Sequence, residues 1–451
     1  MTGQPSREAA ARRPYDLALK FAGFYGGKVE ITPRVPVYRL EDFAVWYSPG
    51  VAEVSRAIHD RDELGFEYTN RWNTIAIVTD GSRVLGLGDI GATASLPVME
   101  GKSLLFKYLG GVDAFPIPIS AHDPDRFIDV VKALEPGLGG INLEDISHPK
   151  CFSILESLRE EMRIPVWHDD QQGTAAATVA GLINALELTD REIPETRITF
   201  VGAGAANLAN ARLAEAAGFP PSNFIMVDSK GILSSEREDM DAMAGSNPWK
   251  REFALKTNPD LISGDTERAL EGSDVLIAAS VPGPGMIHKQ WIRGMAPDPI
   301  VFSLANPVPE IWPWEASDAG ARVVATGRSD FANQVNNSLV FPSVFRGVLD
   351  VRASTITDRM AVSAALELAA FAREKGLSDD NIIPSMTDWE VYPRVAVATA
   401  EEAIKEGVAK LKLGSEELAE RCRTNIEQAR DKLSVLMRSG SIPAPPNGKI
   451  Y

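Results

Sequence analysis

Apolar residues in the first third of the chain fall into short runs rich in β-branched and aliphatic side chains. Each run ends at polar residues or glycine, which is the pattern of buried strands whose ends open onto a site. A glycine–serine pair follows the first run and leads into another apolar segment, which favours a hairpin. The predicted strands lie at 74–80, 83–88, 112–117, 139–143 and 164–168.

An alanine-rich helical segment at 175–188 precedes a second set of strand-like runs. Strands that alternate with helices predict a parallel, doubly wound sheet, and such sheets bind ligands outside the carboxyl ends of their strands. The predicted strands lie at 197–201, 223–228, 274–279, 299–305 and 322–327, with a helix at 205–217. The segment 234–265 has no clear periodicity and is predicted to be a loop-rich insertion.

Helix-favouring residues dominate after about residue 360, for example at 361–375 and 395–411, and the last ten residues form a proline-containing tail. The pattern predicts an α/β protein in three parts. These are an N-terminal α/β domain over 1–172, a Rossmann-like dinucleotide-binding domain over 173–360, and a helical C-terminal segment with its tail over 361–451.

Composition excludes several classes of function. The 451 residues carry a formal net charge of −16, which argues against nucleic acid as a partner. No apolar run approaches the ~20 residues that span a bilayer, and the N-terminus lacks a signal-peptide core, so a cytoplasmic protein is expected. The two cysteines, Cys151 and Cys422, belong to no metal-binding or disulfide pattern.

A glycine-rich turn follows the predicted strand at 197–201 and opens a helix, the context in which backbone N–H groups bind a pyrophosphate. Such a turn alone is equally compatible with a structural strand-to-helix connection. Asp228 ends the next strand, where a carboxylate bonds the adenosine ribose, and this favours NAD or NADP binding. Lys230 could neutralise the 2′-phosphate of NADP, so the choice stays open. The predicted cofactor residues are Gly202, Ala203, Gly204, Ala205, Ala206 and Asp228.

Two acidic pairs, Glu144-Asp145 and Asp169-Asp170, end strands in the first part of the chain. Mg²⁺ and Mn²⁺ prefer oxygen ligands of this kind, although solvated turns and helix caps explain either pair alone. Lys102 begins a predicted helix and Tyr47 precedes a turn, and composition assigns neither to catalysis.

Several segments in the same order resemble the malic enzyme family, particularly its short bacterial and archaeal members. The resemblance covers about residues 35 to 355, with departures at Ser48, Gln172 and Asn207. The segments are YSPGVAEV (47–54), VLGLGDIG (84–91), PVMEGK (97–102), INLEDIS (141–147), HDDQQGT (168–174), GAGAA (202–206), LANPVPE (304–310) and ATGRSDFANQVNN (325–337).

The resemblance implies oxidative decarboxylation of L-malate to pyruvate and CO₂ with reduction of NAD⁺ or NADP⁺, in a homodimer or higher homo-oligomer. Chemistry then requires a neutral lysine as base, so we expect burial and nearby cations to lower its pKa. The implied roles are general acid for Tyr47, general base for Lys102, support of that lysine for Asp169, and metal ligation for Glu144, Asp145 and Asp170. Asn306 and Asn337 match residues that contact the diacid substrate or nicotinamide, with Asn336 a close alternative to Asn337. Arg83 lies where some members of the family place an arginine for a substrate carboxylate, although many short bacterial members lack it.

Three other functions are compatible with the sequence. The substrate could be a substituted malate, because motifs do not report pocket shape. A malolactic-type enzyme would retain its cofactor and yield lactate. A dinucleotide-binding regulator without catalysis is disfavoured by the joint presence of Tyr47, Lys102 and the acidic residues.

Overall fold

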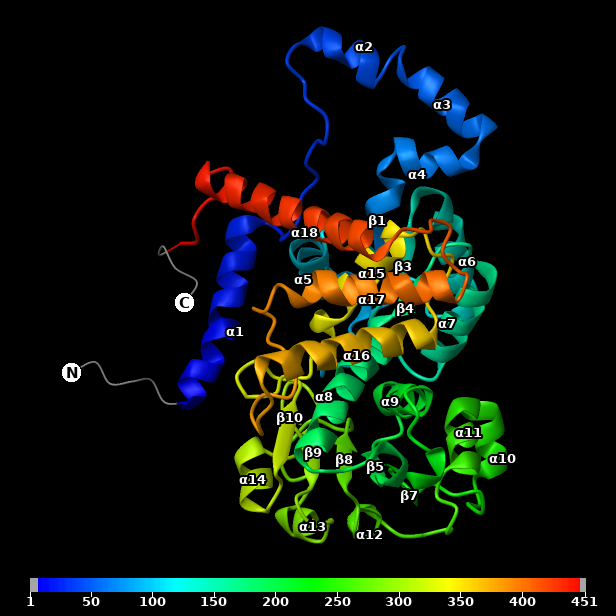
Figure 1. Ribbon diagram of the computed structural model, residues 1–451, viewed down its shortest axis with the longest axis vertical. Helices are drawn as coiled ribbons and strands as arrows, with labels where there is room; N and C mark the ends of the chain where they lie inside the picture. The colour runs from blue at the N-terminus through cyan, green and yellow to red at the C-terminus, as the bar shows by residue number, and fades with distance from the viewer. Residues whose placement is uncertain (1–6, 447–451) are drawn as a thin grey trace, which may run out of the picture.

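The computed structural model describes residues 7–446. Two sheets, built mainly of parallel strands, lie one above the other along the long axis, and a thin arm extends from the upper end (Figure 1). The N-terminal part comprises α1 (Arg7–Tyr25), α2 (Phe43–Trp46), α3 (Val51–Asp60), α4 (Gly65–Tyr68), β1 (Thr74–Thr79), α5 (Gly91–Gly110), β2 (Asp113–Pro118), α6 (Pro124–Leu134), β3 (Gly140–Leu143), α7 (Lys150–Glu161) and β4 (Val166–His168).

The upper sheet has the strand order β2-β1-β3-β4, and all its pairs are parallel. Strand β3 is buried along its whole length, as expected for a central strand covered on both faces. The ring of Phe345 lies against Gly140 in this strand. The carboxyl ends of β1, β3 and β4 therefore share one edge, where the acidic pairs follow β3 and β4.

The predicted hairpin after β1 is wrong. Residues 83–88 form a tight turn with a single bridge between Val84 and Gly88, and β1 pairs instead with β2 and β3. Leu85 has a φ of 47° and is exposed, as is Leu87, so this segment buries too little apolar surface to form a strand.

The lower sheet has the order β10-β9-β8-β5-β6-β7. Pairs among the first five strands in this order are parallel, and β7 adds an antiparallel edge, which confirms the predicted doubly wound sheet. The elements are β5 (Ile198–Val201), α9 (Ala205–Ala216), β6 (Phe224–Asp228), β7 (Gly231–Ile232), α10 (Met240–Ser246), α11 (Pro248–Lys256), α12 (Thr266–Leu270), β8 (Val275–Ala278), α13 (Lys289–Arg293), β9 (Ile300–Ser303), α14 (Pro313–Asp318) and β10 (Val323–Thr326).

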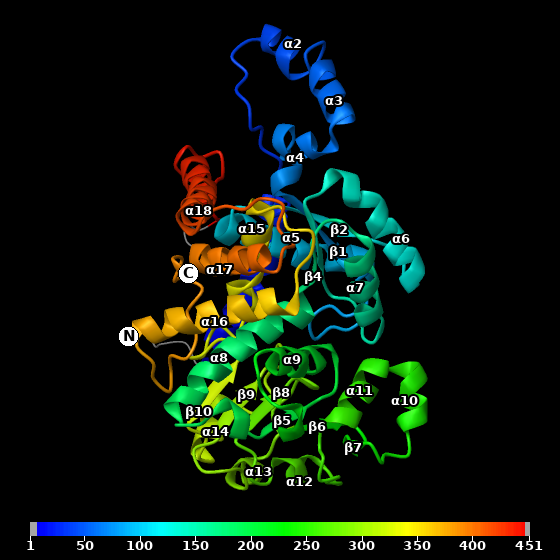
Figure 2. The same ribbon diagram turned by 45° about the vertical axis from the view of Figure 1, so that its right-hand side comes forward.

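Long helices join and cover the two sheets: α8 (Thr174–Leu188), α15 (Phe341–Asp350), α16 (Asp358–Lys375), α17 (Val391–Lys405) and α18 (Ser415–Arg438). Helix α8 runs between the sheets (Figure 2), and its alanines allow close packing against α9 and α16. Helices α15 and α18 pack on α5 of the N-terminal part. The domain boundaries at 172 and 360 stay a prediction.

Two further expectations need correction. The helix predicted at 395–411 ends at Lys405, because Gly407 follows with a φ of 76°. The segment 234–265 contains the short helices α10 and α11 rather than mainly loop, and Asn247 caps the second of them. The proline-containing tail carries no helix or strand up to residue 446, and its end lies outside the described residues.

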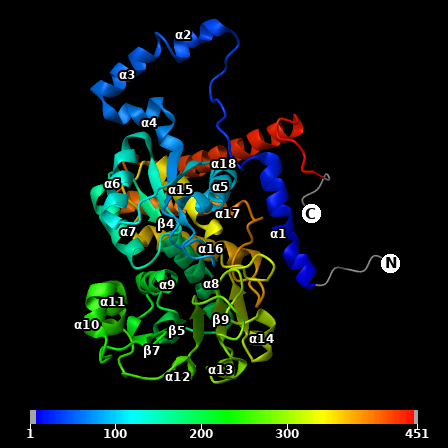
Figure 3. The same cartoon turned by 180° about the vertical axis from the view of Figure 1, so that it is seen from behind.

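The arm comprises residues 27–70 with α2, α3 and α4, and Figures 1 to 3 all draw α2 and α3 away from the body. Its apolar side chains are largely exposed, among them Tyr38 at 89% and Leu40 at 80%. Exposed apolar area of this extent is typical of surfaces that bind a partner. Within residues 7–446, no helix is long and apolar enough to cross a membrane.

Candidate active site

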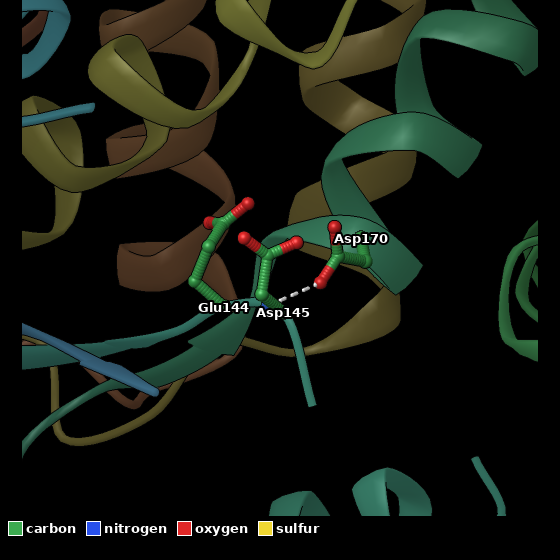
Figure 4. Close-up of side chains that lie close together, drawn as sticks. All are labelled: Glu144, Asp145 and Asp170. Atoms are coloured by element: carbon green, nitrogen blue, oxygen red, sulfur yellow. Dashed lines mark hydrogen bonds between the residues drawn. The ribbon is translucent and has the colours of Figure 1, made fainter. Parts of the chain in front are cut away.

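Three carboxylates converge at the shared edge of the upper sheet (Figure 4). Glu144 and Asp145 follow β3, and Asp170 follows β4, so the parallel pairing of these strands brings them together. One carboxylate oxygen from each side chain lies within 4.8 Å of the others. The backbone N–H of Asp145 donates to Asp170 Oδ2 at 2.8 Å, which holds the two loops together.

The electrostatics of this cluster favour a bound cation. Burial, together with the charge of Asp170, raises the pKa of Asp145 to about 8. Burial also raises the pKa of Glu144 and of Asp170, and Lys102 opposes the shift in both. Asp145 Oδ2 is buried and has no hydrogen-bond partner among the described residues. An all-oxygen set with an orphaned buried oxygen is well suited to Mg²⁺ or Mn²⁺.

Lys102, in α5, lies beside this cluster. Its Nζ contacts Asp169 Oδ2 and lies 3.1 Å from Glu144 Oε1. The ring of Phe341 lies 4.4 Å from the ammonium group. Asp169 is itself fixed by Trp167, whose Nε1 donates to Asp169 Oδ1 at 3.2 Å. The lysine is thus held at one position between two carboxylates.

The expectation that Lys102 has a lowered pKa is wrong for this arrangement. Burial lowers the pKa of Lys102, but the charges of Asp169, Glu144 and Asp170 outweigh it, so the net shift is upward. A lysine among carboxylates keeps its proton until their charge is compensated. Neutralisation of the acidic cluster is therefore a condition for Lys102 to act as a base.

The glycine-rich turn joins β5 to α9 in the lower sheet. Gly202 has a φ of 98°, and a Cβ there would lie 2.5 Å from the carbonyl oxygen of Ala279. The turn thus needs glycine both for its backbone conformation and for its close contact with the end of β8. Gly204 precedes α9, whose first turn has no side-chain cap. Its N–H groups are available to a diphosphate, so the turn fits a dinucleotide.

Asp228 ends β6, as predicted, but its carboxylate is already engaged. Oδ1 accepts the backbone N–H of Lys230 at 2.8 Å and Arg237 Nη1 at 2.9 Å, and Oδ2 contacts Lys250. Burial is outweighed by the hydrogen bonds from Arg237 and Lys250, so the pKa of Asp228 is lowered. Asp239 in turn binds Arg237 and the ammonium group of Lys230.

The remaining predicted residues differ in their placement. The carbonyl oxygen of Asn306 would lie 2.9 Å from a Cβ at Gly86, so the loop after β9 contacts the turn after β1. Asn337 lies against Gly173, next to the acidic loop, whereas Asn336 caps a short helical turn by accepting the N–H of Ser338.

Arg83 is exposed and lies in the turn after β1, where its backbone N–H donates to the carbonyl oxygen of Asp145 at 3.0 Å. Its charge partly offsets the upward shift that burial causes in the pKa of Asp170. Tyr47 does not join the site. It directly follows α2 in the arm and is 71% exposed.

Comparison with known proteins shows to which protein family this chain belongs. The family model described as the malic enzyme N-terminal domain matches residues 26–159, and the model of the malic enzyme NAD binding domain matches residues 171–404. The chain belongs to the malic enzyme family. It is 47% identical over 397 residues to the bifunctional malic/malolactic enzyme of Bacillus subtilis (strain 168), covering 88% of this chain and 95% of that protein.

Other members of the malic enzyme family are similarly close. The NADP-dependent malic enzyme of Halomonas elongata is 42% identical over 399 residues, covering 85% of this chain and 92% of that protein. The crystal structure of Entamoeba histolytica malic enzyme superposes with a TM-score of 0.94 at 43% identity, over 98% of this chain and 93% of that chain.

Sequence reasoning missed several residues of this malic enzyme site. Trp167 is part of a strand and Phe341 begins a helix, and nothing in the sequence indicates that Trp167 bonds Asp169 or that Phe341 lies beside Lys102. Arg237 and Lys250 lie in the segment without clear periodicity. A weak signal existed there, because basic residues recur within a short distance after Asp228.

Proposed function

We propose that this member of the malic enzyme family oxidises L-malate and releases CO₂ to give pyruvate, with reduction of a nicotinamide dinucleotide and dependence on Mg²⁺ or Mn²⁺. The observation that carries the proposal is the contact of Lys102 with the carboxylates that follow β3 and β4, at the carboxyl edge of the upper sheet. Glu144, Asp145 and Asp170 would hold the cation. Bound there, it would polarise the C2 oxygen of malate, while NAD(P)⁺ accepts a hydride from C2.

The protein's own groups perform the proton transfers. Lys102 Nζ takes the proton of the C2 hydroxyl, and Asp169 holds that amine in place through its fixed carboxylate. Arg83 compensates a carboxylate of the diacid, and Asn306 and Asn337 orient substrate and nicotinamide. After CO₂ leaves, Tyr47 supplies the proton that C3 requires.

Lys102→Ala tests this role. We expect turnover, followed by the absorbance of the reduced nicotinamide, to fall at least a thousandfold while dinucleotide affinity stays within about twofold. Lys107→Ala, in the same helix and paired with Asp113, is the matched control and should keep wild-type turnover. Unchanged malate oxidation by Lys102→Ala would remove this residue from the mechanism.

Tyr47 is proposed to act in the site of a second copy of the chain. The proposal is supported by the exposure of Tyr47 and of Trp46, at 71% and 44%, on an arm drawn apart from the body. A homodimer that buries the arm would account for the exposure of these two side chains and for the position of the arm. Mixing inactive Tyr47→Phe with inactive Lys102→Ala should restore up to about a quarter of wild-type turnover through mixed dimers. Absence of recovery in a mixture verified to contain mixed dimers would refute the shared site.

NADP⁺ is proposed as the preferred cofactor. Arg237 and Lys250 pair with Asp228 and compensate its charge, so this carboxylate does not repel a 2′-phosphate. Three cations face two carboxylates in this cluster, which leaves a net positive charge for a 2′-phosphate. We expect kcat/KM to favour NADP⁺ by at least tenfold and Lys230→Ala to reduce that ratio. Equal use of both cofactors would contradict the proposal.

A second candidate activity is malolactic, since a relative at 47% identity bears the name bifunctional malic/malolactic enzyme. Such an enzyme would reduce pyruvate to lactate with the dinucleotide still bound. Quantifying pyruvate and lactate after complete consumption of malate separates the two, because malic activity alone yields one reduced dinucleotide for each pyruvate and no lactate.

A further inference from the structure

His148 connects the two parts of the molecule at the dinucleotide site. It belongs to the loop that follows β3 and carries the acidic residues Glu144 and Asp145. A Cβ built on Gly204 would meet His148 at 4.0 Å, through both Cδ2 and Nε2 of the ring. The nitrogen-bearing edge of this imidazole therefore faces the glycine-rich turn from the opposite side of the boundary between the two sheets.

The backbone around His148 is fixed. Arg83 N–H donates to the carbonyl oxygen of Asp145 at 3.0 Å, and Ser147 N–H donates to Ser82 Oγ at 2.9 Å. Ser82 is anchored in turn through its hydroxyl, which donates to Asp80 Oδ1 at 2.6 Å. The loop thus presents the imidazole at a defined position, which is what a binding group requires.

The surroundings of His148 suit an anion. Partial burial, followed by the charges of Arg83 and Lys250, lowers the pKa of His148. Lys250 pairs with Asp228, and the preceding Val227 accepts the N–H of Gly202, so this cation lies near the same turn. A neutral imidazole still carries one N–H donor. Among the side chains and backbone groups that the structure describes, none forms a hydrogen bond with this ring. The edge that faces Gly204 is therefore available to a ligand.

We propose that His148 is a dinucleotide-binding residue contributed by the N-terminal part, and that it donates a hydrogen bond to the diphosphate held at the Gly202–Gly204 turn. The proposal rests on the dinucleotide site described above. Because the same loop carries Glu144 and Asp145, binding of the diphosphate also positions these two side chains. His148 is thus a residue that links cofactor binding to the acidic cluster.

Calorimetric titration of the full chain, in chelator and without malate, tests this role. A hydrogen bond to a charged group is worth about 1.5 kcal/mol or more, so His148→Ala should bind ADP-ribose and NADP⁺ at least about tenfold more weakly. Adenosine, which lacks the diphosphate, should bind with unchanged affinity. His148→Gln keeps an N–H donor and should recover most of the loss. His288→Ala, an exposed histidine before α13 that lies against Trp291, is the control and should match wild type.

Steady-state kinetics give an independent readout: His148→Ala should raise the KM for the dinucleotide about tenfold with kcat within a factor of three. Wild-type affinity of His148→Ala for ADP-ribose would overturn the proposal. Equal weakening of adenosine and ADP-ribose would also overturn it, because it would indicate a general distortion. A protein that binds ADP-ribose through His148 yet fails to oxidise malate would sink the proposed function and leave this assignment standing.

Discussion

The acidic cluster predicts an unusual dependence of stability on pH when no metal is bound. Asp145 has a pKa of about 8 in the folded protein, against an ordinary value of 3.8. The folded state therefore holds a proton between these values that the unfolded state has released, so the free energy of unfolding falls as pH rises through this window. The raised pKa values of Glu144 and Asp170 act in the same direction.

The size of this change in the free energy of unfolding follows from the pKa shift of Asp145. One pKa unit corresponds to about 1.4 kcal/mol, so two pH units inside the window remove about 2 to 3 kcal/mol for one group. Lys102 has a raised pKa, and its contribution is complete below its ordinary value of 10.5, so it stays constant between pH 6 and 8. A bound cation replaces the proton, and its stabilising effect should therefore grow with pH.

Urea unfolding followed by circular dichroism, at pH 6 and pH 8, in chelator and in Mn²⁺, measures these effects. In chelator, the free energy of unfolding should be lower at pH 8 than at pH 6 by about 2 to 3 kcal/mol or more. In Mn²⁺ most of that loss should disappear. Asp145→Asn has no titrating carboxylate there and should lose correspondingly less in chelator. A metal-free wild type that is equally stable or more stable at pH 8 would refute the reasoning.

Two other predictions concern positions outside the acidic cluster. Arg346 and Asp350 pair at 2.8 Å and are fully buried. Arg346→Met should therefore lower the free energy of unfolding, measured in urea, by about 3 to 5 kcal/mol. A second variant that also carries Asp350→Leu should recover part of this lost stability. Gly202→Ala would force a φ of 98° on alanine and a clash with the carbonyl oxygen of Ala279. The affinity for the dinucleotide, measured by calorimetry, should therefore fall at least about a hundredfold. Near-native affinity would show that the diphosphate does not bind at this turn.

Much of the fold could be predicted from the sequence because the deciding signals are local. The alternation of apolar strands with helical segments was enough to predict the doubly wound sheet, including the strand that ends at Asp228. Acidic pairs after two strands indicated where oxygen ligands could gather, since parallel strands bring their carboxyl ends to one edge, and the resemblance to the malic enzyme family implied their role as metal ligands. The hairpin after β1 failed because periodicity does not reveal how much of Leu85 and Leu87 is buried.

Only the tertiary structure decided which groups act on one another. The pKa of Lys102 depends on the summed charge of Asp169 and Glu144, which come from two other elements. His148 meets Gly204, and Asn306 meets Gly86, across a boundary that local sequence patterns cannot specify. Periodicity and turn chemistry are properties of neighbouring residues, and the sequence by itself therefore determined the elements and the residue types at their ends. Electrostatic interactions and contacts depend on distance in space, so the chemistry of this site was decided by the packing of the two sheets.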